Sequence, residues 1–220
     1  MKAVILAGGF GTRLKHILPN TPKPMADING KPFLQLLINY LEKQGFTEFV
    51  ISTHYLKEQI ASYFEAQSNI SFAPEDEPLG TGGAILNSIK NLSGDVAVIN
   101  GDTFLEIDFA SFWAAHKGRL TLALREVDDT SRYGRVEVDG QKITAFTEKG
   151  QGGKGYINGG NYIVNCEWLR AQNLPQKFSF ETDFMVKLHP EYYITNGYFI
   201  DIGVPEDYER AHAELIHDLK

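Results

Sequence analysis

The chain has 220 residues, of which 43% are hydrophobic, and this length is sufficient for one domain with a large core. Its formal net charge of -7 argues against duplex nucleic acid or an anionic membrane as the main partner, and its single cysteine, Cys166, excludes an intrachain disulfide. No stretch approaches the roughly 18 apolar residues that a bilayer-spanning helix needs. We expect one domain over residues 1–220 that works in the cytoplasm, with a homo-oligomer left open.

Segments of strand and helix character alternate along the first half of the chain, which predicts an α/β architecture. Short strands are expected at residues 2–6, 49–52, 70–72 and 96–99. Helical periodicity predicts helices at residues 32–44, 58–66 and 83–90, and Gly45 is placed to end the first of them. The strand at residues 96–99 is apolar throughout, which is typical of the centre of a parallel sheet.

From residue 120 the pattern turns toward β structure. Strands are expected at residues 121–127, 134–138 and 143–146, separated by turn residues. A further strand at residues 156–164 is interrupted by Asn158-Gly159-Gly160, and glycines inside a strand often mark the close approach of a ligand. Helices are expected near residues 167–172, 181–188 and 206–219.

The most informative stretch is the turn after the first strand, Leu6-Ala7-Gly8-Gly9-Phe10-Gly11-Thr12-Arg13-Leu14. Its glycines let backbone N–H groups approach phosphate oxygens, and Arg13 adds a planar fork for a bidentate contact. Pro22-Lys23-Pro24 supplies a second cation. The pattern lacks the third glycine of a dinucleotide-binding loop and the Gly-Lys-Ser/Thr of a P-loop. We interpret it as a triphosphate cradle; the alternative is a tight turn with an incidental surface Arg and Lys.

Two aspartates follow strand-like segments. Asp102 ends Asn100-Gly101-Asp102, directly after the strand at residues 96–99, where open α/β sheets bind ligands. Asp201 follows Tyr198-Phe199-Ile200 and precedes a turn. Carboxylate oxygens suit Mg²⁺ that is shared with nucleotide phosphates, so the two together would form a magnesium site. The alternative for each is an aspartate that caps a turn.

Polar residues in the second half suit a sugar phosphate. Lys149 enters a glycine-rich loop at residues 150–155 and is placed to reach a second phosphate, unless it is a solvated lysine of a hairpin. The Asn158 amide offers both a donor and an acceptor for a hydroxyl. Glu181 is suited to binding sugar hydroxyls. An equally good explanation of this residue is a carboxylate at the start of a helix, where the helix dipole favours negative charge.

Seven segments together resemble the sugar-1-phosphate nucleotidyltransferase family. They are residues 6–14 and 77–84, Pro22-Lys23-Pro24, Asn100-Gly101-Asp102, Glu148-Lys149, Asn158-Gly159-Gly160 and Asp201-Ile202-Gly203. Within that family, residues 77–84, 178–181 and 199–208 most resemble the D-glycero-α-D-manno-heptose 1-phosphate guanylyltransferases, which make GDP-heptose for bacterial surface polysaccharides.

The resemblance implies a single Rossmann-like nucleotidyltransferase domain of three α/β/α layers, with a mixed, mostly parallel sheet and without the C-terminal β-helix of many relatives. It implies Mg²⁺ on Asp102 and Asp201, with Arg13, Lys23 and Asp102 as the catalytic set. The implied nucleotide contacts are Leu6, Ala7, Gly8, Gly9, Gly11, Thr12, Arg13, Lys23, Gly80, Thr81, Gly82, Asn100 and Gly101. The implied sugar-phosphate contacts are Tyr133, Gly134, Glu148, Lys149, Asn158, Gly159 and Glu181.

The implied reaction needs no protein nucleophile, because a phosphate monoester is already ionised near pH 7. A sugar-1-phosphate oxygen would attack the α-phosphorus of the nucleoside triphosphate, with GTP favoured, and pyrophosphate would leave. Uridylyl, thymidylyl or adenylyl transfer to another sugar phosphate stays open. A non-catalytic module that only binds a nucleotide sugar is the hypothesis from another class, and the complete charged set argues against it.

Overall fold

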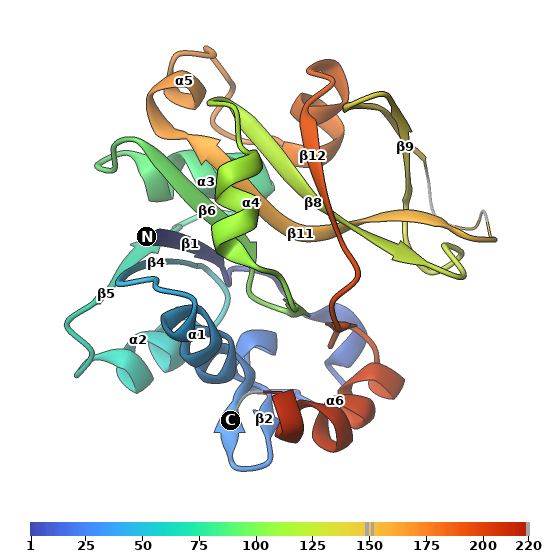
Figure 1. Ribbon diagram of the computed structural model, residues 1–220. Coiled ribbons are helices and arrows are strands. Elements are labelled where there is room, and N and C mark those ends of the chain that lie inside the picture. The colour runs from blue at the N-terminus through green and yellow to red at the C-terminus, as the bar shows by residue number, and fades with distance from the viewer. Residues whose placement is uncertain (148–149, 151, 219–220) are drawn as a thin grey trace.

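The computed structural model describes residues 1–147, 150 and 152–218. A nine-stranded sheet with the order β5-β4-β1-β6-β11-β8-β12-β10-β9 runs through the molecule, with helices on both faces (Figure 1). Its strands are β1 (Lys2–Leu6), β4 (Glu48–Thr53), β5 (Ile70–Pro74), β6 (Asp95–Asn100), β8 (Leu120–Val127), β9 (Arg135–Asp139), β10 (Lys142–Phe146), β11 (Gly155–Asn165) and β12 (Glu191–Thr195). The expected α/β fold class and its three layers are confirmed.

Alternate residues of the central strands are buried in two separate cores, one on each face of the sheet. In β1, Ala3 and Ile5 face the core that α1 (Phe33–Lys43), α2 (Lys57–Phe64) and α4 (Phe109–Ala115) cover. Val4 faces the opposite core, which includes α3 (Gly80–Ile89) and α5 (Cys166–Arg170). Because successive side chains of a strand point to opposite faces, an unbroken apolar run such as β1 is filled from both sides.

The sheet is mixed, and most of its strands run in the same direction, as expected. Strands β5, β4, β1 and β6 pair in parallel, as do β8 and β12. All other pairings between described strands of this sheet are antiparallel. Because only β11 and β10 run against the other strands, seven of the nine strands share one direction, and the expected mixed, mostly parallel sheet is confirmed. The antiparallel pairings arise where β11 lies between β6 and β8 and where β10 lies between β12 and β9.

Smaller elements surround the carboxyl ends of the parallel strands. They are η1 (Thr12–Leu14), η2 (Lys23–Met25), β2 (Asp27–Ile28), β3 (Lys31–Pro32), β7 (Thr103–Leu105), β13 (Phe199–Asp201) and α6 (Pro205–Asp218). β13 pairs with β7 in antiparallel register, and this pair is separate from the large sheet. It therefore carries residues 199–201 next to the end of β6.

Most of the expected elements are confirmed within a few residues, and the differences are local. α3 begins at Gly80, three residues before the predicted start, and the strand interrupted at Asn158 runs continuously as β11 with a register shift. The helix predicted at residues 181–188 is instead a π-helical turn, η3 (Phe180–Phe184), followed by a 3₁₀ turn, η4 (Met185–Lys187). The wide turn buries Phe180, Phe184 and Met185 together in one core.

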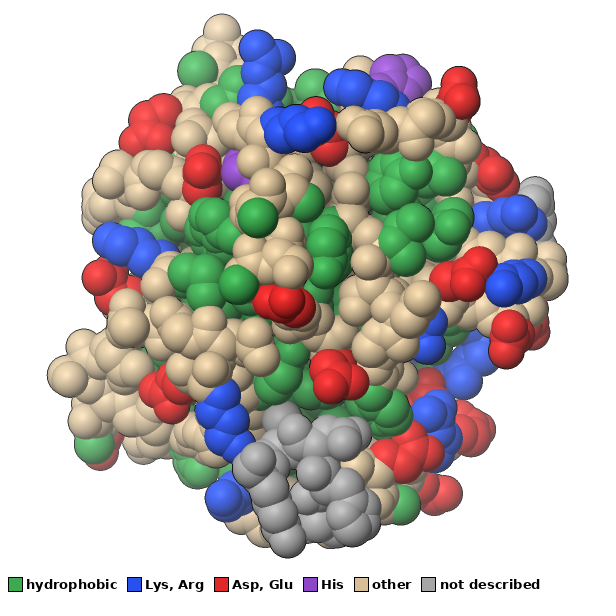
Figure 2. Space-filling model, in the orientation of Figure 1, with side chains coloured by type: hydrophobic (Ala, Val, Ile, Leu, Met, Phe, Trp, Pro, Cys, Tyr) green, Lys and Arg blue, Asp and Glu red, His purple; other side chains and the backbone are tan. Residues whose placement is uncertain are grey.

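The sequence patterns did not indicate α4 or β12. α4 is a short aromatic helix that Asp108 caps by accepting a hydrogen bond from the Ser111 N–H, and β12 is recognisable only by its pairing with β8. On the face shown in Figure 2, acidic and basic side chains are interspersed rather than gathered by sign. None of the helices that the structure describes has the length and apolar character needed to cross a membrane.

Candidate active site

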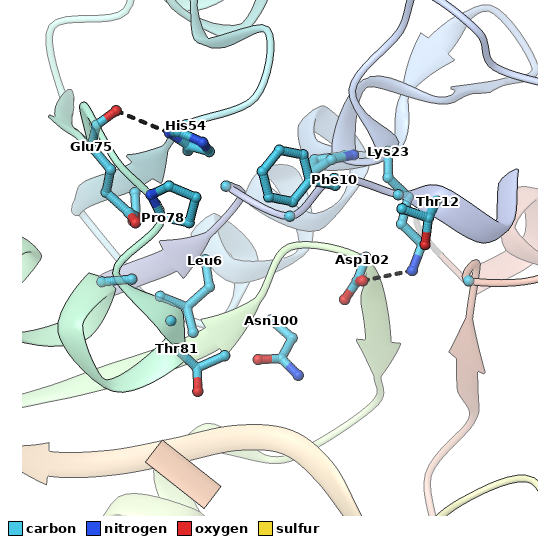
Figure 3. Close-up of a pocket in the computed structure, with 18 of the residues that line it drawn as sticks. Leu6, Phe10, Thr12, Lys23, His54, Glu75, Pro78, Thr81, Asn100 and Asp102 are labelled. Carbon is cyan, nitrogen blue, oxygen red and sulfur yellow. Dashed lines mark hydrogen bonds and ion pairs between the residues drawn. The ribbon is translucent and has the colours of Figure 1, made fainter. Parts of the chain in front are cut away.

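A cavity of about 400 Å³ opens where β1, β4 and β6 end (Figure 3). This is the carboxyl edge of the parallel strands, where open α/β sheets bind ligands. Its lining includes the residues Leu6, Gly8, Gly9, Gly11, Thr12, Arg13, Lys23, Gly80, Thr81, Asn100 and Asp102 from the predicted set. The structure thus brings the predicted nucleotide side of the site together from four separate segments.

The glycine loop is shaped by close packing at two of its positions. Gly11 has φ +57°, and a Cβ there would lie 3.2 Å from the Lys23 Cβ. A Cβ on Gly8 would lie 3.2 Å from the His54 Cβ, whereas Gly9 has open space around it. Gly8 and Gly11 therefore let the loop fold against its neighbours, and Gly9 leaves room at the cavity.

Two predicted nucleotide residues lie behind the cavity wall. Ala7 is buried and its N–H donates to the Ser52 carbonyl. The Gly101 N–H donates to the Leu6 carbonyl, and a Cβ on Gly101 would lie 2.7 Å from that oxygen. Their visible role is to hold the end of β1 against β4 and β6, and direct contact with a nucleotide stays a prediction.

Lys23 joins the two predicted metal ligands. Its Nζ lies 2.6 Å from Asp102 Oδ2 and 3.6 Å from Asp201 Oδ1, and its side chain is only 10% exposed. The pairing of β13 with β7 places Asp201 opposite Thr103, and the Ile202 N–H donates to the Asp102 carbonyl. This strand pair explains why two aspartates far apart in the sequence meet at one ammonium group.

Burial raises the pKa of Asp201, and the positive charge of Lys23 partly offsets that effect. The Gly203 N–H donates to Asp201 Oδ1 at 2.8 Å and orients this carboxylate. A Cβ on Gly203 would lie 2.8 Å from Lys23 Nζ, so a glycine is needed beside the ion pair. Asp201 is therefore held beside Lys23, whose positive charge favours the ionised carboxylate.

The two aspartates fit the predicted magnesium site in their chemistry. Mg²⁺ is usually bound by one or two carboxylates together with substrate phosphates and waters. Among the residues that the structure describes, no group of three or more His, Cys, Asp or Glu side chains is arranged to hold an ion. Asp102 and Asp201 would thus form a metal site that is complete only with a phosphate ligand.

Sequence reasoning missed the polar group at the inner end of the cavity. Glu75 is 6% exposed, and its carboxylate accepts hydrogen bonds from the Ser52 hydroxyl at 2.9 Å and from the Leu79 N–H at 2.9 Å. His54 Nδ1 donates to the Glu75 carbonyl, and the Phe10 ring stands edge-on to the His54 ring (Figure 3). The position of Glu75, just before the motif at residues 77–84, was the only available signal.

The start of α3 is bound to the segment that contains η3. The Phe178 N–H donates to the Leu79 carbonyl, and the Gly82 N–H donates to the Phe178 carbonyl. A Cβ on Gly82 would lie 2.1 Å from the Phe178 ring, and one on Gly80 would lie 2.5 Å from the Phe178 carbonyl oxygen. Gly82 therefore packs behind the cavity, and its predicted contact with the nucleotide stays a prediction.

A chain of side-chain hydrogen bonds connects the cavity to the predicted sugar side. Thr81 Oγ1 donates to Glu181 Oε2 at 2.7 Å. The Tyr162 hydroxyl donates to Glu181 Oε1 at 3.1 Å and accepts from Asn158 Nδ2 at 2.8 Å. Burial raises the pKa of Tyr162 well above its ordinary range, so this hydroxyl stays protonated. The structure thus brings Asn158 and Glu181 together, with Thr81 and Tyr162 as the links.

Three further predicted sugar-phosphate residues, Tyr133, Gly134 and Gly159, lie in the part of the chain that the structure describes. The Tyr133 ring meets the Phe199 ring edge to face at 5.7 Å, close to Asp201 in β13. Gly134 and Gly159 are tightly packed, because a Cβ would lie 2.7 Å from the Thr147 carbonyl oxygen and 2.6 Å from the Leu105 Cδ2, respectively. Glu148 and Lys149 lie outside the described residues.

A glycine loop, cations and paired carboxylates at the carboxyl edge of an α/β sheet are typical of a protein that acts on nucleoside triphosphates. The family model described as "Nucleotidyl transferase" matches residues 2–218, and the chain belongs to this family of enzymes.

Two curated relatives are similar over nearly their whole length. A D-glycero-alpha-D-manno-heptose 1-phosphate guanylyltransferase of Aneurinibacillus thermoaerophilus is 43% identical, with 99% of each chain covered. One of Campylobacter jejuni is 44% identical, covering 94% of this chain and 97% of the relative. The crystal structure of HddC from Yersinia pseudotuberculosis has a TM-score of 0.89 at 42% identity, covering 97% of this chain and 98% of that one. A second structure of that protein is complexed with GMP-PN.

Proposed function

We propose that the protein transfers GMP from GTP to D-glycero-α-D-manno-heptose 1-phosphate, releasing pyrophosphate and forming GDP-heptose. One observation carries the proposal: the cavity unites a glycine loop, Lys23 and the Asp102 carboxylate in a chain that is 43–44% identical to two heptose 1-phosphate guanylyltransferases. Supply of a nucleotide sugar for surface polysaccharide synthesis is part of the same proposal.

The positive groups of the cavity suit a triphosphate. Arg13, Lys23 and the loop at residues 8–11 all line the cavity. Two anionic substrates repel each other, so fixed cations that hold both reduce the barrier to their meeting. In this proposal Arg13 and Lys23 bind the triphosphate, and Lys149 binds the sugar phosphate.

Glu75 supports the preference for guanine. Its carboxylate has about four acceptor positions and uses two of them on Ser52 and Leu79, so acceptor capacity is left at the inner end of the cavity. Guanine presents two adjacent donors, N1–H and N2–H, on one edge. Uracil and thymine present a single N–H between two carbonyl groups, which a carboxylate repels. A buried acceptor of this kind discriminates strongly against bases without the matching donors.

The sugar would lie beside the Asn158-Tyr162-Glu181 group. Because the Tyr162 hydroxyl and the Thr81 hydroxyl both donate to Glu181, the carboxylate is fixed before a substrate arrives. A site built to hydrogen-bond hydroxyl groups penalises sugars that lack them or present them in another configuration.

The reaction requires that the protein hold the two substrates in position. It requires no proton transfer to or from a side chain. An oxygen of the sugar phosphate attacks the α-phosphorus in line, one P–O bond forms, and the bond to the pyrophosphate leaving group breaks. Mg²⁺ on Asp102 and Asp201 would neutralise charge on the phosphate oxygens. Arg13 and Lys23 stabilise the negative charge that develops on the pyrophosphate, and the Gly8 to Gly11 loop keeps the triphosphate extended.

A panel of GTP, ATP, UTP and dTTP against the 1-phosphates of heptose, mannose, glucose and N-acetylmuramic acid tests the proposal, with pyrophosphate release as the readout. We expect the highest kcat/KM with GTP and the manno-configured heptose 1-phosphate. A preference for another base would overturn the guanylyl assignment, and a preference for glucose 1-phosphate would overturn the heptose assignment. A purified protein that binds GTP but releases no pyrophosphate with any pair would support the non-catalytic alternative.

Variants of the sugar side refine the same test. Glu181→Gln and Asn158→Ala are expected to weaken discrimination between sugar phosphates more than discrimination between bases, since neither residue lines the cavity that contains Glu75. Thr182→Val is a matched control, because Thr182 is exposed on the same turn and its hydroxyl donates to the neighbouring Asp183 rather than to the Asn158, Tyr162 and Glu181 side chains. Equal loss of base and sugar discrimination in Glu181→Gln would contradict the division of the pocket.

A further inference from the structure

Lys23 occupies the place between the two carboxylates to which the proposed function assigns a metal. Its Nζ contacts Asp102 Oδ2 at 2.6 Å and Asp201 Oδ1 at 3.6 Å. The side chain is 10% exposed, so the ammonium is held in the wall rather than moving freely in solvent. A hydrogen bond from the Ala26 N–H to the Lys23 carbonyl, and a proline on each side of Lys23, fix the backbone that carries it.

A divalent ion held between both carboxylates competes with the ammonium for Asp102 Oδ2. It also repels the ammonium strongly, because the two positive charges would lie only a few ångströms apart in a largely buried place. We propose that Lys23 is a resident counter-cation of the Asp102–Asp201 pair, which a divalent ion displaces and which then pairs with the triphosphate. This inference rests on the proposed function for the identity of the metal site.

The displaced ammonium has a suitable acceptor within the same cavity. Lys23 lines the cavity together with Arg13 and the glycine loop, and a Cβ on Gly11 would lie 3.2 Å from the Lys23 Cβ. A triphosphate bound along that loop would therefore offer Lys23 new negative charge close to its present position. Without the triphosphate, displacement leaves the ammonium buried and unpaired, which is unfavourable.

Binding of the metal and binding of the nucleotide are consequently coupled. The ammonium lowers the affinity of the carboxylate pair for a divalent ion in the nucleotide-free protein, and the triphosphate removes that competition. By linkage the metal strengthens nucleotide binding to the same extent. Lys23 thus acts as a positioning residue for the carboxylates in the free protein and as a phosphate ligand in the complex.

The test is the binding of Mn²⁺ alone to the full-length protein, measured as the decrease in the electron paramagnetic resonance signal of free Mn²⁺. Lys23→Met keeps much of the side-chain volume and removes the ammonium. We expect Lys23→Met to bind Mn²⁺ at least about tenfold more tightly than the wild type. Lys23→Gln, which keeps a polar end group, should also bind more tightly than the wild type.

Arg13→Met is the matched control, because it tests whether the loss of any nearby positive charge raises the Mn²⁺ affinity. Arg13 is exposed and acts on Asp201 only at longer range, with no ion pair recorded among the described residues. If removing any nearby positive charge were sufficient, Arg13→Met would raise the Mn²⁺ affinity as much as Lys23→Met does. We expect a change of less than about threefold, because exposed charges are screened by solvent.

Several outcomes would overturn the proposal. Equal or weaker Mn²⁺ binding by both Lys23 variants would do so, as would an equal gain in Arg13→Met. A gain that persists in Lys23→Met/Asp102→Asn would place the ion elsewhere and remove the metal assignment as well. The product assay with wild-type protein is separate, so the proposed transfer of GMP can stand even if the displacement of Lys23 is disproved.

Thermal unfolding of each variant with and without Mn²⁺ confirms that the protein is folded, and Mn²⁺ should raise the Tm of Lys23→Met more than that of the wild type.

Discussion

Asp102 lies where the end of β6 meets Lys23, and its side chain is 37% exposed toward the cavity. We expect Asp102→Asn to lower kcat/KM about 10²-fold, since the lost interaction would be worth about 3 kcal/mol in the transition state. The assay is pyrophosphate release at a fixed Mg²⁺ concentration. Asp76→Asn is the control, because Asp76 is fully solvent-exposed in its ion pair with Lys57. Activity within threefold of the wild type, or full activity in excess chelator, would contradict the metal assignment.

In our proposal Arg13 binds the triphosphate and Lys149 binds the sugar phosphate. We expect Arg13→Ala to raise the KM for GTP and Lys149→Ala to raise the KM for the sugar phosphate, with a smaller fall in kcat where a contact tightens in the transition state. Steady-state kinetics with each substrate varied in turn measure both effects. If both variants affect both substrates equally, the two cations do not serve separate halves of the site.

At the scale of elements, the start of α3 and the segment around Phe178 depend on glycines for their close approach. We expect Gly82→Ala to lower the free energy of unfolding by about 1–3 kcal/mol, because the added methyl group would overlap the buried Phe178 ring, which lies 2.1 Å from the Cβ position. Urea denaturation followed by circular dichroism measures the change.

Gly9→Ala is the matched control for that measurement. A Cβ on Gly9 has no neighbour within 4 Å, so the free energy of unfolding should change little. If Gly82→Ala were as stable as Gly9→Ala, the packing of α3 against Phe178 would be looser than the hydrogen bonds between these segments indicate.

The elements that sequence patterns predicted well are those with a strong local signal. β1 is an unbroken apolar run, and α1 has a clear helical period that ends near Gly45, whose φ is +88°. β12 lacked such a signal, and at η3 the sequence pattern predicted an ordinary helix instead of the wide turn. β12 is defined by its parallel pairing with β8, and η3 by the joint burial of its aromatic residues, so neither depends mainly on local sequence.

At the scale of the whole molecule, Cys166 reports on the integrity of the core. It is the only cysteine and is fully buried at the start of α5. Burial raises the pKa of its thiol to about 11, which suppresses the reactive thiolate. We expect almost no reaction with a thiol reagent at pH 8 in the folded protein, and complete reaction after unfolding in urea. Rapid reaction under native conditions would show that this core opens locally.

The raised pKa of the Cys166 thiol also predicts how the free energy of unfolding depends on pH. Because the thiol ionises at lower pH in the unfolded chain than in the folded protein, the unfolded state loses its proton first. The Cys166 contribution is therefore fully present below about pH 9 and is lost as the pH rises toward about 11. The difference in urea stability between the wild type and Cys166→Ala should decrease over this range, and a constant difference would contradict the shift.

The sequence by itself determined the α/β class, the glycine loop, the cations Arg13 and Lys23 and the two aspartates, because each depends on residue type and on local spacing. The tertiary structure alone decided which residues meet. The pairing of β13 with β7 brings Asp201 to Asp102, and the contact of α3 with η3 connects Thr81 to Glu181. The place of Glu75 at the inner end of the cavity was also decided only there. These contacts join segments far apart in the chain, and local patterns carry no information about the register that unites them.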